Sequence, residues 1–230
     1  MADQPVLVIT GASTGIGAAT ARRAVEFGQR VVLAARSEDK LTSLAEELGG
    51  EEKAIAVRCD VTRWDDHEAL VETALDRFGR LDGYFANAGF GSKRGFLEES
   101  VEHWKSMIDT NVLGAALSIR SVLGHFRKHN SGHFILTSSV AGRRTLAGSL
   151  YSATKHAVTA MGEALRAEVA DTDIKVTLIE PGMVDTPFFD NRPSGALEAD
   201  DIARAVMFAL TQPPHVDVNE ILIRPIHQPT

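Results

Sequence analysis

The chain has 230 residues, of which 44% are hydrophobic, so it can bury one substantial core and fits a single α/β domain. Its formal net charge is -7 and it has no long basic run, which argues against nucleic acid or an anionic membrane surface as the main partner. No stretch is long and apolar enough to span a membrane, and the start of the chain lacks the charged pattern of a targeting segment. We therefore expect a soluble, cytoplasmic protein.

Cysteine usage agrees with a reducing compartment. The chain has one cysteine, Cys59, so no disulfide can form within it. We expect a small buried apolar side chain at this position rather than a catalytic thiol.

Short apolar runs rich in β-branched residues alternate with helical patterns along the whole chain. Strands are predicted at 5–10, 30–35, 54–61, 81–89, 132–139, 175–182 and 220–225. Helices are predicted at 15–28, 37–49, 63–79 and 100–129, around Tyr151, and at 199–211. This alternation indicates βαβ units and a parallel sheet, and strands that are apolar throughout suit a doubly wound sheet covered on both faces. We expect one domain over 1–230.

The least regular stretch is residues 181–198, which are rich in Pro, Gly, Asp and Asn. It follows the carboxyl end of a predicted strand, where open α/β sheets bind ligands. The stretch is therefore a candidate substrate lid, and a plain surface loop is the competing interpretation.

A glycine-rich loop, "TGASTGIG", connects the first predicted strand to the first predicted helix. Gly11, Gly15 and Gly17 would let the backbone approach a pyrophosphate at the helix N-terminus, where free N–H groups favour anions. The spacing differs from G-x-G-x-x-G, and a tight strand-to-helix turn is the alternative. Its position in the first βαβ unit favours a dinucleotide site.

The end of the second predicted strand bears on the choice of cofactor. An NAD site usually has an acidic residue there for the ribose hydroxyls, but this chain has Ala35 followed by Arg36 and Ser37. A guanidinium suits a phosphate on the adenosine ribose, so we expect NADP(H), with Ser37 as a further donor. A solvated loop charge is the alternative for Arg36.

Tyr151 and Lys155 are four residues apart and share one helix face. They are either two ordinary surface side chains or a proton-handling pair. A nearby cation lowers the pKa of a phenol, which is near ~10 when unperturbed, toward the pH at which it can act as a base. The other tyrosine, Tyr84, lies in an apolar predicted strand, where packing explains it better.

Several motifs in order give the chain a family resemblance. These are "TGASTGIG", "CDVT" (59–62), "ANAG" (86–89), "TNVLG" with Asn111, "TSS", "YSATK" and "PGMVDT". Over essentially its whole length the chain resembles the short-chain dehydrogenase/reductase family, whose usual NNAG motif begins here with Ala86. The resemblance implies a Rossmann-like sheet of about seven strands with helices on both faces.

The resemblance also implies a set of site residues. The catalytic set would be Asn111, Ser138, Tyr151 and Lys155, with no metal. Ser138 lies thirteen residues before Tyr151, the spacing that the family uses, and Ser139 should point the opposite way on an extended segment. Asn111 would belong to a proton relay to Lys155, with helix-interior hydrogen bonding as the alternative. Cofactor contacts would come from Gly11, Ser13, Thr14, Gly15, Ile16, Gly17, Arg36, Ser37, Asp60, Val61, Asn87, Ala88, Gly89, Tyr151, Lys155, Pro181, Gly182, Val184 and Thr186.

The leading functional hypothesis is an NADP(H)-dependent oxidoreductase acting on a small carbonyl or secondary alcohol, with Tyr151 as acid and base. A redox-sensing regulator that binds NADP without chemistry and a purely structural subunit are the alternatives. Phe188 and Phe189 suggest apolar substrate contacts, and Arg143, Arg144 or Arg192 could reach a substrate carboxylate. The resemblance further implies a homodimer or homotetramer.

Overall fold

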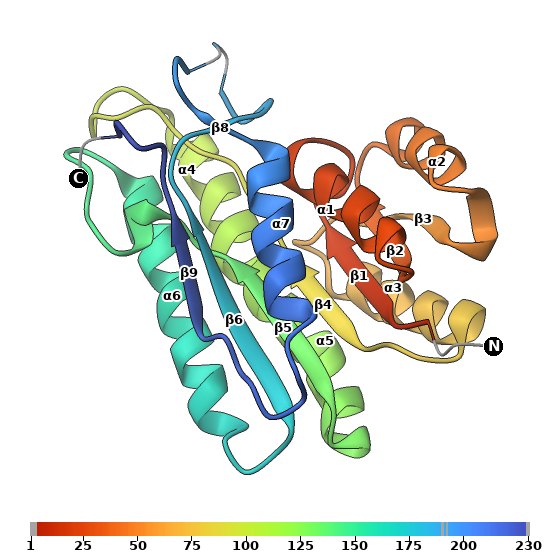
Figure 1. Ribbon diagram of the computed structural model, residues 1–230. Helices are drawn as coiled ribbons and strands as arrows, with labels where there is room; N and C mark the ends of the chain where they lie inside the picture. Colours follow the sequence, from red (N-terminus) through yellow and green to blue (C-terminus); the bar gives the residue numbers. More distant parts are fainter. Residues whose placement is uncertain (1–3, 190, 192, 229–230) are drawn as a thin grey trace.

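The computed structural model describes residues 4–189, 191 and 193–228, and in this part seven parallel strands form one sheet in the order β3-β2-β1-β4-β5-β6-β9 (Figure 1). The strands are β1 (Val6–Thr10), β2 (Arg30–Ala35), β3 (Ala54–Arg58), β4 (Gly83–Ala86), β5 (Gly132–Thr137), β6 (Ile174–Pro181) and β9 (Glu220–Ile223). The chain runs outward from β1 to one edge and then returns through β4 to the other. The crossing point lies between β1 and β4, where doubly wound sheets bind ligands.

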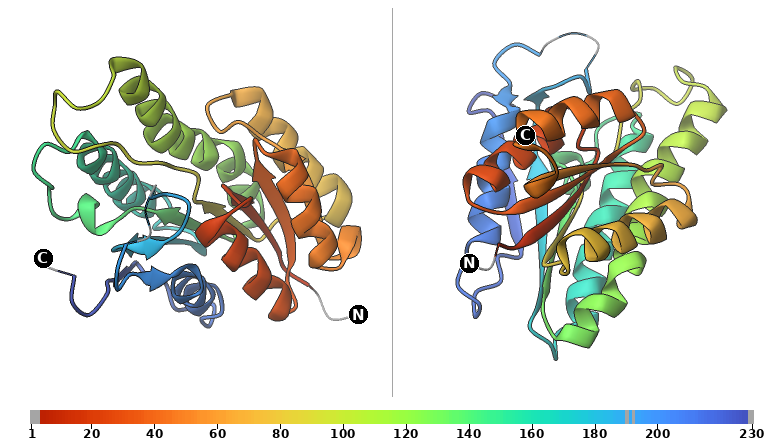
Figure 2. Two further views of the ribbon diagram at one scale, coloured as in Figure 1. Left: turned by 90° about the horizontal axis from the view of Figure 1, so that it is seen from above. Right: turned by 90° about the vertical axis from the view of Figure 1, so that its right-hand side faces the viewer.

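Helices cover both faces of this sheet (Figure 2). They are α1 (Gly15–Glu26), α2 (Glu38–Glu47), α3 (Trp64–Phe78), α4 (Val101–Ile108), α5 (Gly114–His129), α6 (Leu150–Glu168) and α7 (Ala199–Leu210). Short helical turns are η1 (Gly50–Glu52), η2 (Asp109–Leu113) and η3 (Val140–Gly142). This architecture confirms the predicted single-domain, doubly wound, Rossmann-like fold.

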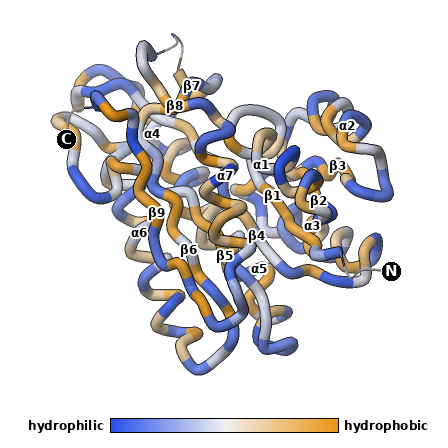
Figure 3. Tube along the Cα trace, viewed as in Figure 1, coloured by the Kyte–Doolittle hydropathy of each residue, from blue (hydrophilic) through white to orange (hydrophobic). Residues whose placement is uncertain are grey.

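Two apolar layers follow from the alternation of side chains along each strand. In β1, Val6 and Val8 pack toward α3, α5 and α6, whereas Leu7 and Ile9 pack toward α1, α2 and α7. Figure 3 shows the strands as the most continuously hydrophobic segments, with polar stretches on the outer turns of the helices. Burial on both faces explains why an inner strand such as β1 is an almost unbroken apolar run.

Two local features differ from the sequence expectation. The helical pattern of 100–129 is interrupted by the π-helical turn η2 between α4 and α5. Within 181–198, β7 (Val184–Asp185) and β8 (Leu197–Glu198) form a small parallel pair of strands. The pairing of β7 with β8 joins the two ends of that segment. The sequence does not predict these strands, because neither forms an apolar run.

Other expectations concern single residues and the membrane. Cys59 is buried, and desolvation raises the pKa of its thiol to about 12, which agrees with a packing role. Tyr84 is buried in β4, as expected for a core residue. Across the described residues, the helices are too short or too polar to span a membrane. The same residues contain no group of three or more His, Cys, Asp and Glu side chains arranged to hold a metal ion.

Candidate active site

The carboxyl ends of the central strands are held together by Asn87, which follows β4. Its amide nitrogen donates to the carbonyl of Thr10 at 3.1 Å, and its amide oxygen accepts from the Thr137 hydroxyl at 3.2 Å. The Thr10 hydroxyl in turn accepts from the backbone N–H groups of Asn87 and Ala88. The side chain of Asn87 thus holds the carboxyl ends of β1, β4 and β5 together, and the site lies at these strand ends.

The glycine loop packs tightly between β1 and α1. A Cβ on Gly17 would lie 2.3 Å from the carbonyl oxygen of Gly11, so only glycine fits there without moving backbone. Gly11 itself has φ +65 and lies against Ala88. Ser13 and Thr14 complete the turn. Ile16, in the first turn of α1, packs against the hydrophobic core.

The N-terminus of α1 suits an anion. Thr14 occupies the N-cap position with extended backbone, but its side chain makes no capping hydrogen bond, and the first turn contains no acidic residue. By contrast, α2, α3 and α7 all carry acidic side chains in their first turns. The N–H groups at the start of α1 therefore fit the pyrophosphate of a dinucleotide.

The adenosine end of such a cofactor would meet basic side chains at the ends of β2 and β3. Arg36, Ser37 and Arg58 are exposed, and Ser37 occupies the N-cap position of α2. Desolvation acts to raise the pKa of Asp60, but hydrogen bonds from Thr62 and the charges of Arg36 and Arg58 lower it overall. Asp60 is therefore ionised near two cations.

Val61, beside Asp60, is buried, and its carbonyl accepts a 2.9 Å hydrogen bond from the ring of His67. This bond anchors the loop between β3 and α3. Val61 is thus a buried apolar side chain directly next to the ionised Asp60.

Tyr151 and Lys155 lie at the start of α6, facing the ends of the strands. Lys155 is 4% exposed, and its ammonium donates to the Thr137 carbonyl at 2.7 Å and lies 5.7 Å from the centre of the Tyr151 ring. Burial lowers the pKa of Lys155 to about 8. Desolvation raises the pKa of Tyr151 to about 12, and a hydrogen bond with Ser139 opposes that rise. The phenol is therefore protonated at neutral pH, with a cation beside it.

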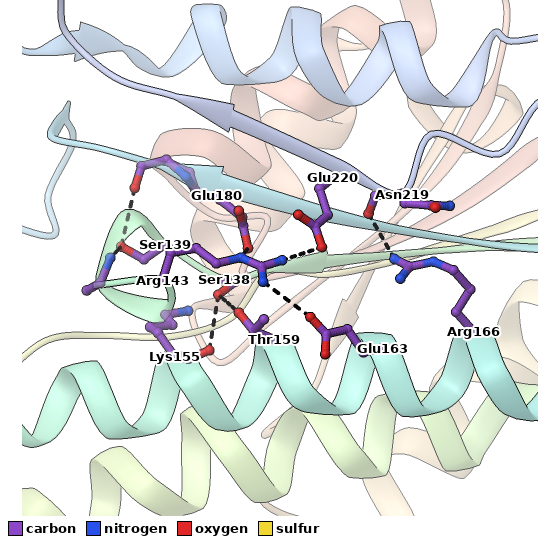
Figure 4. Close-up of polar contacts among 12 residues, drawn as sticks. Ser138, Ser139, Arg143, Lys155, Thr159, Glu163, Arg166, Glu180, Asn219 and Glu220 are labelled. Atoms are coloured by element: carbon purple, nitrogen blue, oxygen red, sulfur yellow. Dashed lines mark hydrogen bonds and ion pairs between the residues drawn. The ribbon is translucent and has the colours of Figure 1, made fainter. Parts of the chain in front are cut away.

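The orientation expected for Ser138 is wrong. Its hydroxyl is buried, donates to the carbonyl of Lys155 at 3.1 Å, and shares a 2.7 Å hydrogen bond with the Thr159 hydroxyl (Figure 4). The alternation of β5 explains this: Phe134 and Leu136 face the layer of α5 and α6, and position 138 follows the same parity. Ser138 thus fastens the end of β5 to α6 and does not face the site.

Ser139 is the serine that contacts Tyr151. Its hydroxyl also caps η3 by accepting from Ala141 N–H at 3.1 Å, and it donates to the Pro181 carbonyl at 3.3 Å. The thirteen-residue spacing to Tyr151 predicted Ser138, but Ser139 is the serine whose hydroxyl contacts Tyr151. The parity of the preceding strand, combined with a small helical turn starting at Ser139, is the sequence signal that could have selected the right one.

Asn111 lies in the π-helical turn η2 and is buried. Its amide oxygen accepts from Phe90 N–H at 3.0 Å, and its amide nitrogen donates to the Phe90 carbonyl at 2.9 Å and to Thr154 at 3.1 Å. The side chain therefore joins the loop after β4 to α6 through bonds to other segments and not within its own helix. A Cβ on Gly89 would lie 3.0 Å from Asn111 Oδ1 and 3.6 Å from Lys155 Nζ, so these groups surround one glycine.

The segment after β6 closes over the glycine loop. Pro181 and Val184 are buried, and Gly182 N–H donates to Ile223 at 2.7 Å. The methyl group of Thr186 lies 3.1 Å from the position that a Cβ on Gly15 would occupy. Gly15 of the glycine loop and Thr186 of the segment after β6 are thus in contact, although they are far apart in the sequence. Both are among the residues expected to contact the cofactor.

An aromatic side chain from the same segment covers Tyr151. Phe188 makes an edge-to-face contact with the Tyr151 ring, with centroids 5.6 Å apart, and packs on Phe189 at 5.0 Å. Its far end also lies against Gly91, where a Cβ would come within 2.7 Å. The surroundings of the phenol are therefore apolar on this side.

The three arginines considered as partners of a substrate carboxylate differ in their surroundings. Arg143 is held by Glu180, Glu163 and Glu220, so its guanidinium is already committed. Arg144 is exposed. Arg192 lies outside the described residues.

A cavity of about 690 Å³ opens at the opposite, amino-terminal ends of the central strands. Among its lining residues is His133, whose ring bonds the Thr177 hydroxyl at 2.8 Å and whose pKa burial lowers to about 3. That imidazole is neutral and already engaged. The chemistry-bearing side chains instead gather at the carboxyl ends of the strands, where we locate the candidate active site.

Comparison with known proteins gives consistent matches. The sequence model of the short chain dehydrogenase family matches residues 5–196. An uncharacterized oxidoreductase of Staphylococcus haemolyticus is 43% identical over 225 residues, covering 96% of this chain and 97% of that protein.

Solved structures agree with these sequence matches. The alcohol dehydrogenase of the archaeon Thermococcus sibiricus, complexed with 5-hydroxy-NADP, superposes with a TM-score of 0.90 at 32% identity, covering 99% of each chain. A short chain dehydrogenase/reductase of Burkholderia phymatum in complex with NAD gives a TM-score of 0.86 at 28% identity, covering 96% of this chain and 89% of that one.

Proposed function

The chain belongs to the short-chain dehydrogenase/reductase family and is an oxidoreductase, and we propose that it transfers hydride between NADP(H) and a small carbonyl or secondary alcohol. One observation carries the proposal. A buried ammonium, Lys155, is fixed beside the phenol of Tyr151 at the strand ends where the glycine loop also lies. This arrangement can move a proton next to a nicotinamide.

In this proposal Tyr151 is the general acid for carbonyl reduction and the general base for alcohol oxidation. The nicotinamide cofactor, when bound, supplies or accepts the hydride. The charge of Lys155 stabilises the phenolate that forms when Tyr151 gives up its proton, which brings the acid and base forms closer in energy. In this proposal Lys155 would also donate to a cofactor ribose, and its bond to the Thr137 carbonyl holds the ammonium at the end of β5.

Ser139 takes the role that was expected of Ser138. Its hydroxyl contacts Tyr151. A substrate oxygen beside them would accept a hydrogen bond from Tyr151, and one from Ser139 once the serine proton turns from the Pro181 carbonyl to the substrate. A donor that is fixed before the reaction stabilises the charge that develops on this oxygen. The cap on η3 and the bond to Pro181 hold the serine in place.

For the cofactor we propose NADP(H) over NAD(H). Arg36, with Arg58 nearby, gives the adenosine end a positive charge suited to a ribose phosphate, and the turn after β2 carries no carboxylate until Glu38. The similar alcohol dehydrogenase was solved with an NADP derivative, whereas the Burkholderia protein was solved with NAD. The family therefore uses both, and the choice rests on these arginines.

We take residues 181–198 as the substrate lid. Phe188 lies over the Tyr151 ring, so a substrate that reaches the phenol must pack against this aromatic face. Small substrates with an apolar substituent next to the carbonyl suit such a site. The name of the similar archaeal protein, an alcohol dehydrogenase, agrees with this class.

We also propose that the chain forms a homodimer or homotetramer. Phe208 on α7 and Leu222 on the edge strand β9 are large apolar side chains that are 56% and 47% exposed. Exposed apolar side chains of this size are typical of surfaces buried in an assembly.

A cofactor absorbance assay with a panel of carbonyl compounds tests the function. Purified protein should oxidise NADPH in the presence of at least one small aldehyde or ketone, and the Lys155→Ala variant should lose both rate and cofactor affinity. If NADPH binds but is never consumed across a broad panel, the redox-sensing regulator is the better account. If neither NADPH nor NADH binds, only a structural role remains.

A further inference from the structure

One arginine beside the candidate serine lies at the centre of a charged cluster. The Arg143 guanidinium contacts three carboxylates, from Glu180 in β6, Glu163 in α6 and Glu220 in β9 (Figure 4). The Nε–Glu180 distance is 2.7 Å and the Nη1–Glu163 distance is 3.2 Å. Four segments that are distant in the sequence therefore meet at one side chain.

Glu180 is the unusual member of this cluster. Its side chain is 1% exposed, whereas those of Glu163 and Glu220 are 53% and 40% exposed. It has the parity of Val176 and Leu178, which face α6, so the strand directs a carboxylate into an otherwise apolar layer. Burial raises the pKa of Glu180, and Arg143 acts against that rise. A buried carboxylate needs such a partner, since an unpaired one is very costly.

The ion pair bridges two segments that both border the site. Arg143 follows η3, which begins directly after Ser139, and Glu180 immediately precedes Pro181. The Ser139 hydroxyl donates to the Pro181 carbonyl at 3.3 Å, four residues from the guanidinium. Residues 139–143 are thus tied to residues 180–181 at both ends, once by a neutral hydrogen bond and once by an ion pair.

Packing leaves η3 little freedom on its other side. A Cβ on Gly142 would lie 2.4 Å from Ser138 Oγ and 2.8 Å from the Lys155 carbonyl, so the turn lies directly on α6. Arg143 then pulls the end of the turn toward β6. The turn is fixed between a helix that carries Tyr151 and a strand that leads to the lid.

From this geometry we propose that Arg143, through Glu180, is a positioning residue that holds the Ser139 hydroxyl against Tyr151 and the Pro181 carbonyl. The proposal rests on the proposed function, since it assigns the pair a part in that reaction. Neither residue touches substrate in this account. Loss of the pair should loosen η3 and move Ser139 by a fraction of an ångström or more, which is enough to cost roughly 10- to 100-fold in rate.

The test compares Arg143→Lys and Glu180→Gln with Glu163→Gln, using turnover of the full-length protein with NADP(H). Lysine keeps the charge but cannot contact three carboxylates in a fixed plane. Glu163→Gln is the matched control, because it removes an exposed partner of the same guanidinium. We expect kcat/KM to fall roughly 10- to 100-fold in the first two variants and to stay within about twofold in the control.

A pH profile separates positioning from plain stabilisation. The hydrogen bond from Ser139 lowers the pKa of Tyr151, so loosening it should move the basic limb of alcohol oxidation to higher pH. The charged group facing the phenol, Lys155, is unchanged in every variant. A role in stability alone would lower the melting temperature and leave this profile where it was.

The double variant Arg143→Met/Glu180→Leu completes the design, because replacing a buried ion pair by apolar side chains often restores stability. We expect it to fold as stably as the parent while kcat/KM stays low and the pH profile stays shifted. Parental kinetics in the double variant, or in Glu180→Gln, would overturn the proposal. Absence of turnover in the parent protein itself would instead refute the proposed function.

Discussion

Ser138 and Ser139 are adjacent in the chain, yet their hydroxyls lie in different surroundings. The Ser138 hydroxyl is enclosed by the Lys155 carbonyl and Thr159, whereas that of Ser139 reaches Tyr151 and Pro181. An extended segment turns successive side chains to opposite faces, so a one-residue difference separates a packing role from a role in the site.

Alanine at each position should therefore give opposite results. Ser139→Ala should lower kcat by about 10²–10³-fold, as for loss of a donor to a developing oxyanion. It should also lose about 0.5–2 kcal/mol of unfolding free energy, because the cap on η3 is removed. Ser138→Ala should retain most of the activity and lose about 1–3 kcal/mol of unfolding free energy, because Lys155 and Thr159 lose a buried partner. Steady-state kinetics and urea unfolding of both variants measure this. Equal losses of activity would contradict the assignment.

Arg36 tests the cofactor proposal at the same scale. Arg36→Asp should shift preference from NADP(H) toward NAD(H), because a carboxylate repels the ribose phosphate and can accept from a free ribose hydroxyl. The ratio of kcat/KM for the two cofactors is the measurement, with Arg63→Asp, an exposed arginine of the next unit, as the control. An unchanged ratio in Arg36→Asp would refute the role of this arginine.

At the scale of elements, the first βα unit is fixed by close backbone contacts. Gly17 in α1 faces the Gly11 carbonyl so closely that a methyl group has no room. Gly124 in α5 has nothing within 4 Å of its Cβ position. The two glycines lie in helices and differ only in what surrounds them.

Gly→Ala at the two positions should thus act in opposite directions. Gly17→Ala should displace the loop and weaken NADPH binding by at least roughly tenfold, since the pyrophosphate relies on this backbone. Gly124→Ala should leave binding unchanged and stabilise the protein by about 0.5–1 kcal/mol, the ordinary gain in a helix. NADPH titration and thermal unfolding give both numbers. Normal binding by Gly17→Ala would contradict the assigned anion site.

Most of the helices and strands could be predicted from the sequence, and two local features could not. The strands and helices were predictable because the inner strands are buried on both faces and each helix has an apolar stripe. The π-helical turn at 109–113 was not, because its residues form a good helical pattern and the bulge depends on Asn111 bonding Phe90 and Thr154. The short ladder of β7 and β8 likewise depends on contacts between segments.

The candidate site was predictable to the same degree. Tyr151 and Lys155 share a helix face by spacing alone, and the glycine loop is a local motif, so both could be placed from the sequence. The choice between Ser138 and Ser139 required the register of β5 against α6. The role of Glu180 required four segments to be brought together, which no local pattern encodes.

At the scale of the whole molecule, burial of the charged Lys155 in the site lowers the stability of the folded state. Lys155 is buried, and its pKa falls from 10.5 to about 8, which corresponds to about 3 kcal/mol of unfavourable free energy at neutral pH. The folded state binds this proton less tightly than the unfolded state. The cost is therefore fully present below pH 8 and is relieved as pH rises from about 8 to about 10.5.

Lys155→Met should accordingly be more stable than the parent at pH 7, by up to about 3 kcal/mol, and inactive. Its advantage should shrink as pH rises through the window from about 8 to about 10.5, because only the parent gains there. Urea unfolding of both proteins at several pH values measures the difference, with Lys128→Met, an exposed lysine, as the control. A difference that does not vary with pH would mean that Lys155 folds without a shifted pKa.

The central claim is that Tyr151 moves the proton in an NADP(H)-dependent reaction, and Tyr151→Phe tests it most directly. This change removes one hydroxyl and keeps the ring that packs on Phe188. We predict that kcat falls about 10²–10⁴-fold, the usual share of a general acid, while NADPH titration shows cofactor binding largely retained. Turnover close to that of the parent enzyme in Tyr151→Phe would contradict the account.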